Sequence, residues 1–348
     1  MTEQQFLNEL EMALTRLPAD ERNDILQDIK EYFTNGREDG KSDSEIAGSL
    51  GSPKEIADEL LTNYVPEKSH TEDKKLIIIT DTAFTKVEMN INHGSLHVYP
   101  SETDTTTIEL VNAPEKLVLT ADVIGDTLSI RLKGPKFNFF SFLSFGKDVR
   151  VNVALPIKTY TALSMKTDNG SISGEKILGK TMTVSSDNGS IKLKEIAAST
   201  LDVQTDNGRI DIDKVQVDIL SSNTDNGRIE LRNIDADQVH AETDNGRIVM
   251  EYINGKIVGK TDNGRITLLT THIDCMIDLE TDNGSILIET ESDPTDVTIR
   301  AKVDHGKIDI FGENNSRTTF GNGTNTIQLS SDNGKITVGK KSASVFSS

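Results

Sequence analysis

One repeat constrains the fold of this chain more than any other feature of its 348 residues. The tetrapeptide Thr-Asp-Asn-Gly, or a close variant, recurs at intervals of 19 residues over five copies and then of 18 and 20. The glycines that end these copies are Gly170, Gly189, Gly208, Gly227, Gly246, Gly264 and Gly284. Later copies end at Gly306 and Gly334, and an early one, Asn92-His93-Gly94, precedes Gly170 by four such periods. A fixed period of this length predicts a solenoid in which each repeat forms one coil.

Apolar residues keep fixed positions relative to these glycines. Two residues after the glycine stand Leu96, Ile172, Ile191, Ile210, Ile229, Ile248, Ile266, Ile286, Ile308 and Ile336. Four residues after it stand Val98, Leu193, Ile212, Leu231, Met250, Leu268, Ile288, Ile310 and Val338. Alternation with a period of two places them on one face of two or three short strands per repeat, so we predict that they fill a continuous interior.

These repeats determine the expected fold class. One repeat buries too little apolar surface to offset the entropy of ordering its backbone, so the coils must stack and share hydrogen bonds. A propeller or sandwich would need hairpin turns every 8–12 residues, and the repeats lack them. We therefore predict a mainly β protein: a right-handed parallel β-helix (solenoid) with coils of about 19 residues, preceded by a small all-α domain.

The Asp-Asn-Gly segments are predicted to turn the corners of the coils. Glycine tolerates positive φ, and an Asp carboxylate can accept the N–H two residues on, in an Asx-turn. Stacking would align one acidic column: Asp168, Asp187, Asp206, Asp225, Asp244, Asp262 and Asp282. Neighbouring carboxylates about 4.8 Å apart would repel by roughly 0.9 kcal/mol in water. Arg209, Arg228, Arg247 and Arg265 follow the glycines of four coils and could offset this repulsion. A ladder of metal or glycan sites is the alternative, but a motif in nearly every turn favours a structural role.

The N-terminal segment, residues 1–64, differs from the rest of the chain. Apolar residues at helical spacing, the capping-box pairs Ser42/Glu45 and Ser52/Glu55, and Pro53 at a first helical position predict four short helices. Residues 1–74 carry 18 acidic and 8 basic side chains, net −10, so the remainder of the chain carries −9 of the total −19. We predict an acidic four-helix domain over residues 1–64, a linker over 65–75 and the β-helix over 76–348.

Charge and composition limit the partners and the compartment. A net charge of −19 argues against nucleic acid and against direct docking on anionic lipid. The single Cys275 excludes an internal disulfide and is typical of a reducing compartment. No secretion signal and no apolar run of roughly 20 residues is present. We therefore expect no transmembrane segment, and a cytoplasmic protein that is either free or peripheral at the inner membrane face.

The most irregular stretch is a Phe-rich insertion at residues 134–147. It carries Phe137, Phe139, Phe140, Phe142 and Phe145 where a loop should be polar. Either it folds back over the open end of the solenoid as a cap, or it is an exposed apolar patch that docks a protein partner or a membrane surface. We treat these five residues as the candidate partner-binding site.

Conventional catalytic motifs are not apparent. Residues 174–181, Gly-Glu-Lys-Ile-Leu-Gly-Lys-Thr, match a phosphate-loop pattern, but the residues that follow alternate as a strand and keep the repeat register. No His, Cys or carboxylate cluster has metal-ligand spacing, and no nucleophile–base pair stands out. The residues predict no catalytic site, no cofactor and no metal.

Two sets of motifs resemble known families. The Thr-Asp-Asn-Gly-Arg-Ile units, from about residue 76 to the end, resemble the bacterial "putative adhesin" family, a domain of unknown function. Leu17-Pro-Ala-Asp-Glu21 and Leu50-Gly-Ser-Pro-Lys-Glu-Ile-Ala57 resemble the helical HAAS-type domain of bacterial membrane-stress and regulator-linked proteins. The resemblance implies a β-helix and an association with cell-envelope stress, without a biochemical activity.

The combined expectation is a non-enzymatic scaffold linked to envelope-stress signalling. Its partner would be a membrane-associated or regulatory protein, and both the solenoid ends and the helical domain permit a homo-oligomer. The alternatives are a glycan-binding or polysaccharide-active β-helix and a surface adhesin.

Overall fold

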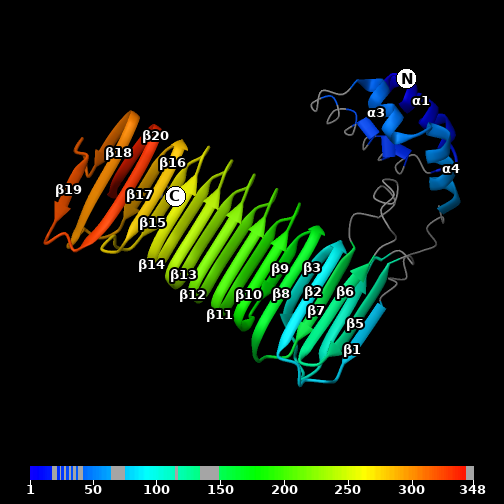
Figure 1. The fold of residues 1–348 in the computed structure, drawn as a ribbon, viewed down its shortest axis with the longest axis horizontal. Coiled ribbons are helices and arrows are strands. Elements are labelled where there is room, and N and C mark those ends of the chain that lie inside the picture. The colour runs from blue at the N-terminus through cyan, green and yellow to red at the C-terminus, as the bar shows by residue number, and fades with distance from the viewer. Residues whose placement is uncertain are drawn as a thin grey trace, which may run out of the picture. The chain divides into compact units, whose positions relative to one another are not determined.

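The computed structural model describes residues 1–17, 22, 23, 25, 26, 29, 30, 33, 37, 42–63, 75–113, 117–133 and 149–341. The chain forms two compact units that divide close to residue 74, and each unit is described by itself. Figure 1 shows helices in the first unit and strands in the second.

The first unit contains α1 (Glu3–Ala13), α3 (Asp43–Leu50) and α4 (Pro53–Asn63), and the described positions between 22 and 37 are helical as well. Both predicted capping boxes are present, since Glu45 N–H donates to Ser42 Oγ and Glu55 N–H donates to Ser52 Oγ. Helix α1 ends earlier than its apolar spacing suggests, yet the turn that follows still buries Leu14 and Leu17. The apolar faces of these helices pack on one another around Phe6, Leu10, Ile29, Phe33, Ile46 and Ile56.

The second unit is a β-solenoid made of twenty strands over the described residues. Its central coils are β8 (Thr159–Asn169), β9 (Ile172–Glu175), β10 (Leu178–Ser186), β11 (Ile191–Thr205), β12 (Ile210–Thr224), β13 (Ile229–Thr243), β14 (Ile248–Thr261), β15 (Ile266–Thr270), β16 (Ile277–Asn283) and β17 (Ile286–Thr290). Strands one repeat apart pair in parallel, so that Ile191, Ile210, Ile229 and Ile248 lie side by side in one row. Each repeat is therefore one coil, as predicted.

The predicted apolar columns fill the interior. Every apolar residue that stands two or four positions after a corner glycine is at most 1% exposed, except Ile308. Ile308 is half-buried because it lies in β18 (Val297–Ile310), the outermost coil at the C-terminal end. Residues 174–181, which match the phosphate-loop pattern, lie on β9 and β10, and no helix follows them.

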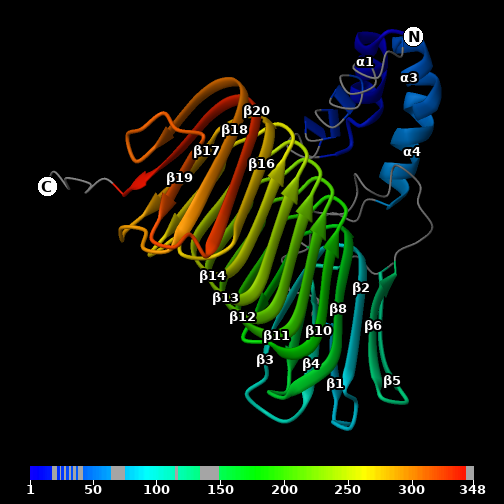
Figure 2. The same cartoon turned by 60° about the vertical axis from the view of Figure 1, so that its left-hand side comes forward.

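The coils are not stacked in sequence order. At the C-terminal end, β20 (Asn325–Lys340) lies between the β16–β17 coil and β18, and β19 (Arg317–Phe320) pairs antiparallel with β18. Figure 2 shows β18 and β20 side by side, with β19 beyond them. The last of the described strands is thus an interior one.

At the N-terminal end of the solenoid, stacking order also differs from sequence order. Its strands are β1 (Lys75–Ile79), β2 (Lys86–His93), β3 (Ser95–Pro100), β4 (Thr106–Val111), β5 (Val118–Ile124), β6 (Thr127–Lys133) and β7 (Arg150–Leu155). The first coil, β2–β3, pairs directly with β8 and β9 on one side and with β6 and β7 on the other. The segment between Gly94 and Gly170 is therefore not a run of four stacked coils, because β4 to β7 fold outward from the β2–β3 coil and end in antiparallel strands.

Candidate functional site

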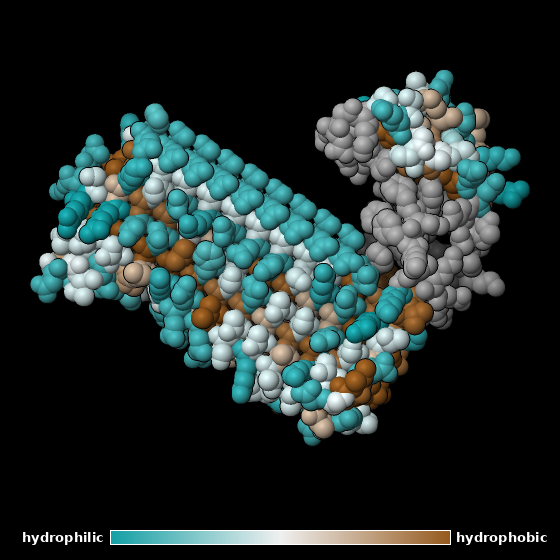
Figure 3. Space-filling view, in the orientation of Figure 1, coloured by the Kyte–Doolittle hydropathy of each residue, from teal (hydrophilic) through white to brown (hydrophobic). Residues whose placement is uncertain are grey.

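The Asp-Asn-Gly corners form one continuous ladder along a long edge of the solenoid, where Figure 3 shows unbroken rows of hydrophilic residues. The Thr or Ser that opens each motif is buried, and its hydroxyl donates to the corner glycine carbonyl of the adjacent coil at 3.0–3.3 Å. The eight donors are Thr167, Ser186, Thr205, Thr224, Thr243, Thr261, Thr281 and Ser331. Each coil is thus tied to its neighbour at the corner.

The corner asparagines make a second ladder. Each side-chain amide donates from Nδ2 to Oδ1 of the asparagine in the adjacent coil at 3.0–3.1 Å. The eight members are Asn169, Asn188, Asn207, Asn226, Asn245, Asn263, Asn283 and Asn333. Because every bond runs in the same direction, the column is a chain of aligned amides that reinforce one another.

The reason for the glycine differs from the predicted one. Of the corner glycines only Gly94 has positive φ, at 100°. At Gly170, Gly189, Gly208, Gly227, Gly246, Gly264 and Gly284 a Cβ would instead overlap the glycine carbonyl of the adjacent coil. The positive-φ prediction is therefore wrong for this column, where glycine is required by the close approach of two backbones.

The aspartates of the corners point away from this ladder. Asp206, Asp225, Asp244, Asp262 and Asp282 are exposed, and no side-chain hydrogen bond or ion pair is found for them in the described part of the chain. Asp168 differs, because its Oδ2 accepts from Asn92 Nδ2 at 3.1 Å. The predicted Asx-turns are therefore absent from these corners. The hydrogen bonds that hold each corner run to the adjacent coil instead. Among the residues with described positions, no group of three His, Cys, Asp or Glu is placed to hold a metal ion.

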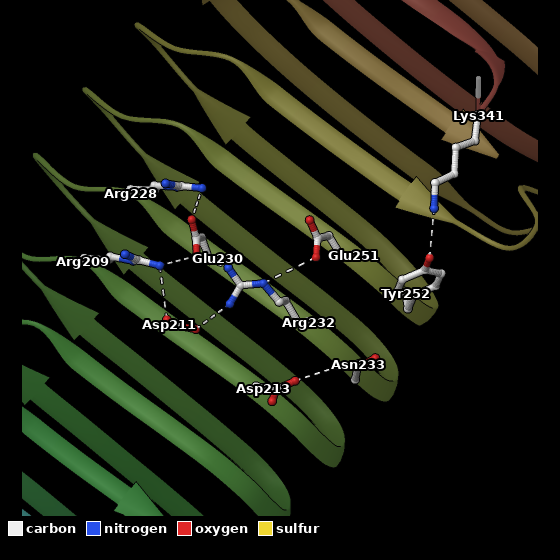
Figure 4. Close-up of polar contacts among 10 residues, drawn as sticks. All are labelled: Arg209, Asp211, Asp213, Arg228, Glu230, Arg232, Asn233, Glu251, Tyr252 and Lys341. Atoms are coloured by element: carbon white, nitrogen blue, oxygen red, sulfur yellow. Dashed lines mark hydrogen bonds and ion pairs between the residues drawn. The ribbon is translucent and has the colours of Figure 1, made fainter. Parts of the chain in front are cut away.

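The arginines that follow the glycines do not neutralise the acidic column, so that expectation is wrong as well. Arg209 and Arg228 lie over the outer face of the sheet and both form an ion pair with Glu230 (Figure 4). Arg232 also pairs with Glu230, so that three guanidinium groups surround one carboxylate. The side chain of Glu230 is 1% exposed, although it projects from the outer face.

Neighbouring carboxylates complete this network across three coils. Asp211 on β12 lies 3.2 Å from Arg209 Nη2 and 3.0 Å from Arg232 Nη1. Glu251 on β14 lies 3.4 Å from Arg232 Nε. Because three cationic and three anionic side chains balance one another, the network fastens β12, β13 and β14 together and leaves no net charge for a ligand.

Burial and the arginines act in opposite directions on Glu230. Burial by itself raises the pKa of this carboxyl, but the charges of Arg232, Arg228 and Arg209 outweigh it and hold the pKa below its usual range. Burial by itself lowers the pKa of Arg232, but the charges of Glu230 and Asp211 outweigh this effect, so the pKa is raised. The sequence held the signal for this network, because the repeat period and strand alternation place Asp211 and Glu230 in one outward row.

A shallow hollow of about 330 Å³ lies on another side of coils β11 to β13. The small side chains of Ala198, Val217 and Ala236 lie next to the acidic groups of Asp218, Asp235 and Asp237. The hollow combines an apolar surface with several hydrogen-bond acceptors. Sequence reasoning did not identify it, because it arises where small residues from three coils stack.

The five phenylalanines predicted to bind a partner, Phe137, Phe139, Phe140, Phe142 and Phe145, lie outside the described residues. The strands on either side are described: β6 ends at Lys133 and β7 begins at Arg150. In the neighbouring coil these two rows are β2 and β3, which the Asn92-His93-Gly94 corner joins.

In the described part of the chain, no helix is both long and apolar enough to span a bilayer. A search of curated proteins finds no match. Among solved structures, the chain is similar to a "putative adhesin" from Bacteroides fragilis with 18% identity and a TM-score of 0.46, over 64% of this chain and 98% of the other. It is also similar to a "putative adhesin" from Parabacteroides distasonis with 12% identity and a TM-score of 0.48, over 77% and 98% of the two chains.

Comparison with protein families identifies both parts of the chain. The HAAS family matches residues 5–59, the helical part. The family described as Toastrack DUF4097 matches residues 84–339. Because this second match spans most of the 348 residues, the chain belongs to the Toastrack DUF4097 family, whose function is unknown.

Proposed function

We propose that the protein is a non-enzymatic interaction scaffold in which the solenoid is a stiff spacer. The observation that carries this proposal is the corner ladder, in which a hydroxyl bond and an amide bond join one coil to the next from Asn169 to Asn333. Opening any coil breaks bonds to both neighbours, so the solenoid resists bending. A repeat that continues without a break is suited to holding two partners at a fixed separation.

The partner-binding elements of this scaffold are the helical unit and the phenylalanines at 137, 139, 140, 142 and 145. We place the protein in the cytoplasm, at the inner membrane face, in envelope-stress signalling. The resemblance of residues 5–59 to HAAS domains supports this assignment. A chain with net charge −19 is repelled by anionic lipid, so contact with the membrane would go through a protein partner.

Crosslinking and purification from envelope-stressed cells test the proposal. The full chain is compared with a variant in which all five phenylalanines are serine, and with a form that lacks residues 1–74. A matched control replaces Ile157, Ile219 and Met276, three exposed apolar residues of the solenoid, by serine. We expect the full chain and the control to recover the same envelope or regulatory protein and the other two to lose it. Recovery of no such protein by the full chain would contradict the proposal.

A second candidate is glycan binding, which the hollow beside Asp218, Asp235 and Asp237 favours. Carboxylates next to small apolar side chains suit the hydroxyls and the C–H faces of a sugar. Glycan-array binding that is lost in Asp235→Asn/Asp237→Asn would support it, while the absence of any binding by the full chain would exclude it.

A further inference from the structure

The two ends of the solenoid differ in how their outermost strands are protected. At the C-terminal end, the outer part of β18 carries charged residues along its free edge: Lys302, Asp304, Lys307 and Asp309. Charges of this kind prevent another strand from adding to an exposed edge. At the N-terminal end, β1 has the sequence Lys-Leu-Ile-Ile-Ile and carries a single charge, at its first residue.

Strand β1 is an edge strand with unusually exposed apolar residues. Among the described strands it pairs only with β4. Leu76 and Ile78, on its outer face, are each 56% exposed. Ile77 and Ile79 lie opposite the buried Ile108 and Thr106 of β4, yet they remain only half-buried. The apolar side chains on both faces of β1 are therefore incompletely covered, because side chains from a strand paired at its free edge are missing.

The other edge strand at this end, β5, is different. It carries Val118 and Ile124, which are 52% and 72% exposed, but Asp122 lies between them among its exposed residues. A charge in the middle of a strand discourages strand addition. The apolar edge is thus confined to β1.

We propose that β1 pairs antiparallel with β1 of a second copy of this chain, about a two-fold axis at Ile77. In this register Leu76 lies opposite Ile78 of the second copy, and Ile78 lies opposite its Leu76. Directly opposed side chains lie about 4.5–5.5 Å apart at Cβ, so each pair covers the other. Two-fold pairing of identical surfaces is the commonest way in which soluble chains associate.

Charge complementarity favours a second copy as the occupant of this edge. Lys75 lies opposite Ile79 of the second copy, and the exposed Asp81 follows that residue two positions later. The two-fold axis generates this Lys–Asp approach twice, one at each end of the paired strands. Within the five paired residues of each copy, no two like charges face each other.

Pairing of one five-residue strand from each copy buries little surface. Interfaces well below about 1,200 Å² are typical of weak, transient association. The expected dimer is therefore reversible and depends on concentration. This inference does not rest on the scaffold function, because it concerns the edge of β1 alone.

Sedimentation velocity over a range of concentrations tests the proposal on the full chain. We expect the wild-type chain to shift from monomer to dimer, and Leu76→Lys/Ile78→Lys to weaken association by about tenfold or more, because lysines then oppose each other. The matched control Val118→Lys/Ile124→Lys changes equally exposed residues on β5 and should associate like the wild type. A wild-type chain that stays monomeric, a β1 variant that still dimerises, or a control that loses the dimer would each overturn the proposal.

Disulfide trapping tests the register. Cys275, the only native cysteine, is first replaced by serine. One chain then carries Leu76→Cys and another Ile78→Cys, and the two are oxidised separately and as a mixture. We expect covalent dimers chiefly in the mixture, because residues 76 and 78 oppose each other across the axis within disulfide reach. Equal crosslinking of each variant with itself would contradict the two-fold axis at Ile77.

Discussion

Single residues in this solenoid are selected by what lies one coil away. A corner glycine packs against the carbonyl of the next glycine, the buried threonine before it donates to that carbonyl, and the asparagine continues a side-chain ladder. The exposed aspartate contributes none of these contacts. Three of the four residues of each motif therefore serve stacking, and conformational freedom at the glycine is secondary.

Replacement of Gly227 by alanine tests this account of the corner. The new Cβ would overlap Gly208 O and approach Thr224 Oγ1 at 2.7 Å, so the coils must move apart. We expect Gly227→Ala to lower the free energy of unfolding by about 3 kcal/mol or more. The control is Gly339→Ala, where a Cβ would meet nothing within 4 Å, and it should change stability by less than about 1 kcal/mol. Urea unfolding of the two variants measures both values, and equal effects would contradict the close-approach explanation.

The Glu230 network gives a pH-dependent prediction. Because its folded pKa lies below the usual value, Glu230 stabilises the fold above about pH 4.3, and this contribution is lost as the pH falls through the folded pKa. We expect Glu230→Gln to cost about 1–3 kcal/mol at pH 7. Glu251→Gln, which removes a more exposed carboxylate from Arg232, should cost less than about 1 kcal/mol. In urea titrations the deficit of Glu230→Gln should shrink below pH 4, and a deficit that is constant with pH would argue against a charge effect.

At the scale of the element, strand alternation and the repeat period predicted the interior, since the isoleucine columns are buried as expected. Each of five coils also has a bend at which one non-glycine residue adopts left-handed backbone angles, with positive φ. The position of this bend could not be predicted in the same way. It falls six residues after the corner glycine, at Lys176, Glu195, Lys214, Asn233 and Tyr252, with φ between 53° and 57°. These positions hold lysine, glutamate, asparagine and tyrosine, and only asparagine favours the left-handed region, so the sequence has no consistent local signal for the bend.

The Glu230 network was not predicted for another reason. Each of its charged residues is ordinary by itself, and only the register of the stacked coils brings them together.

The bend at Lys214 predicts an unusual response to glycine. A non-glycine residue in the left-handed region costs about 1–2 kcal/mol, more than glycine loses in the unfolded chain. We expect Lys214→Gly to raise the free energy of unfolding by about 0.5–1 kcal/mol and Lys214→Val to lower it by about 1 kcal/mol or more, since β-branching is disfavoured there. Lys192→Gly, on an ordinary strand position of β11, should destabilise. Chemical denaturation of the three variants measures these changes in the free energy of unfolding. Destabilisation by Lys214→Gly would show that the bend is unstrained.

At the scale of the whole solenoid, sequence order and stacking order differ at both ends. Strand β2 pairs with β8, although five other strands separate them in the sequence, and β20 enters between β17 and β18. Each arrangement places a strand from near one end of the described strand order, β2 or β20, between two neighbours, which shields its apolar residues on both sides. The repeat spacing could not reveal this arrangement, because an inserted coil keeps the same residues at the same corner positions.

Three residues from one apolar column test the stacking order. Ile229 lies in a central coil, Ile336 in the last strand of the sequence, and Ile308 in the outermost coil, and only Ile308 is partly exposed. If β20 is an interior coil, Ile336→Ala should cost about as much as Ile229→Ala, about 2–5 kcal/mol, since both leave a cavity between two neighbouring coils. Ile308→Ala should cost clearly less, because one side of its site is already open. Denaturant unfolding of the three variants, followed by the β-sheet circular dichroism signal, gives the comparison. Stacking in sequence order requires the reverse ranking, with Ile336→Ala the mildest of the three.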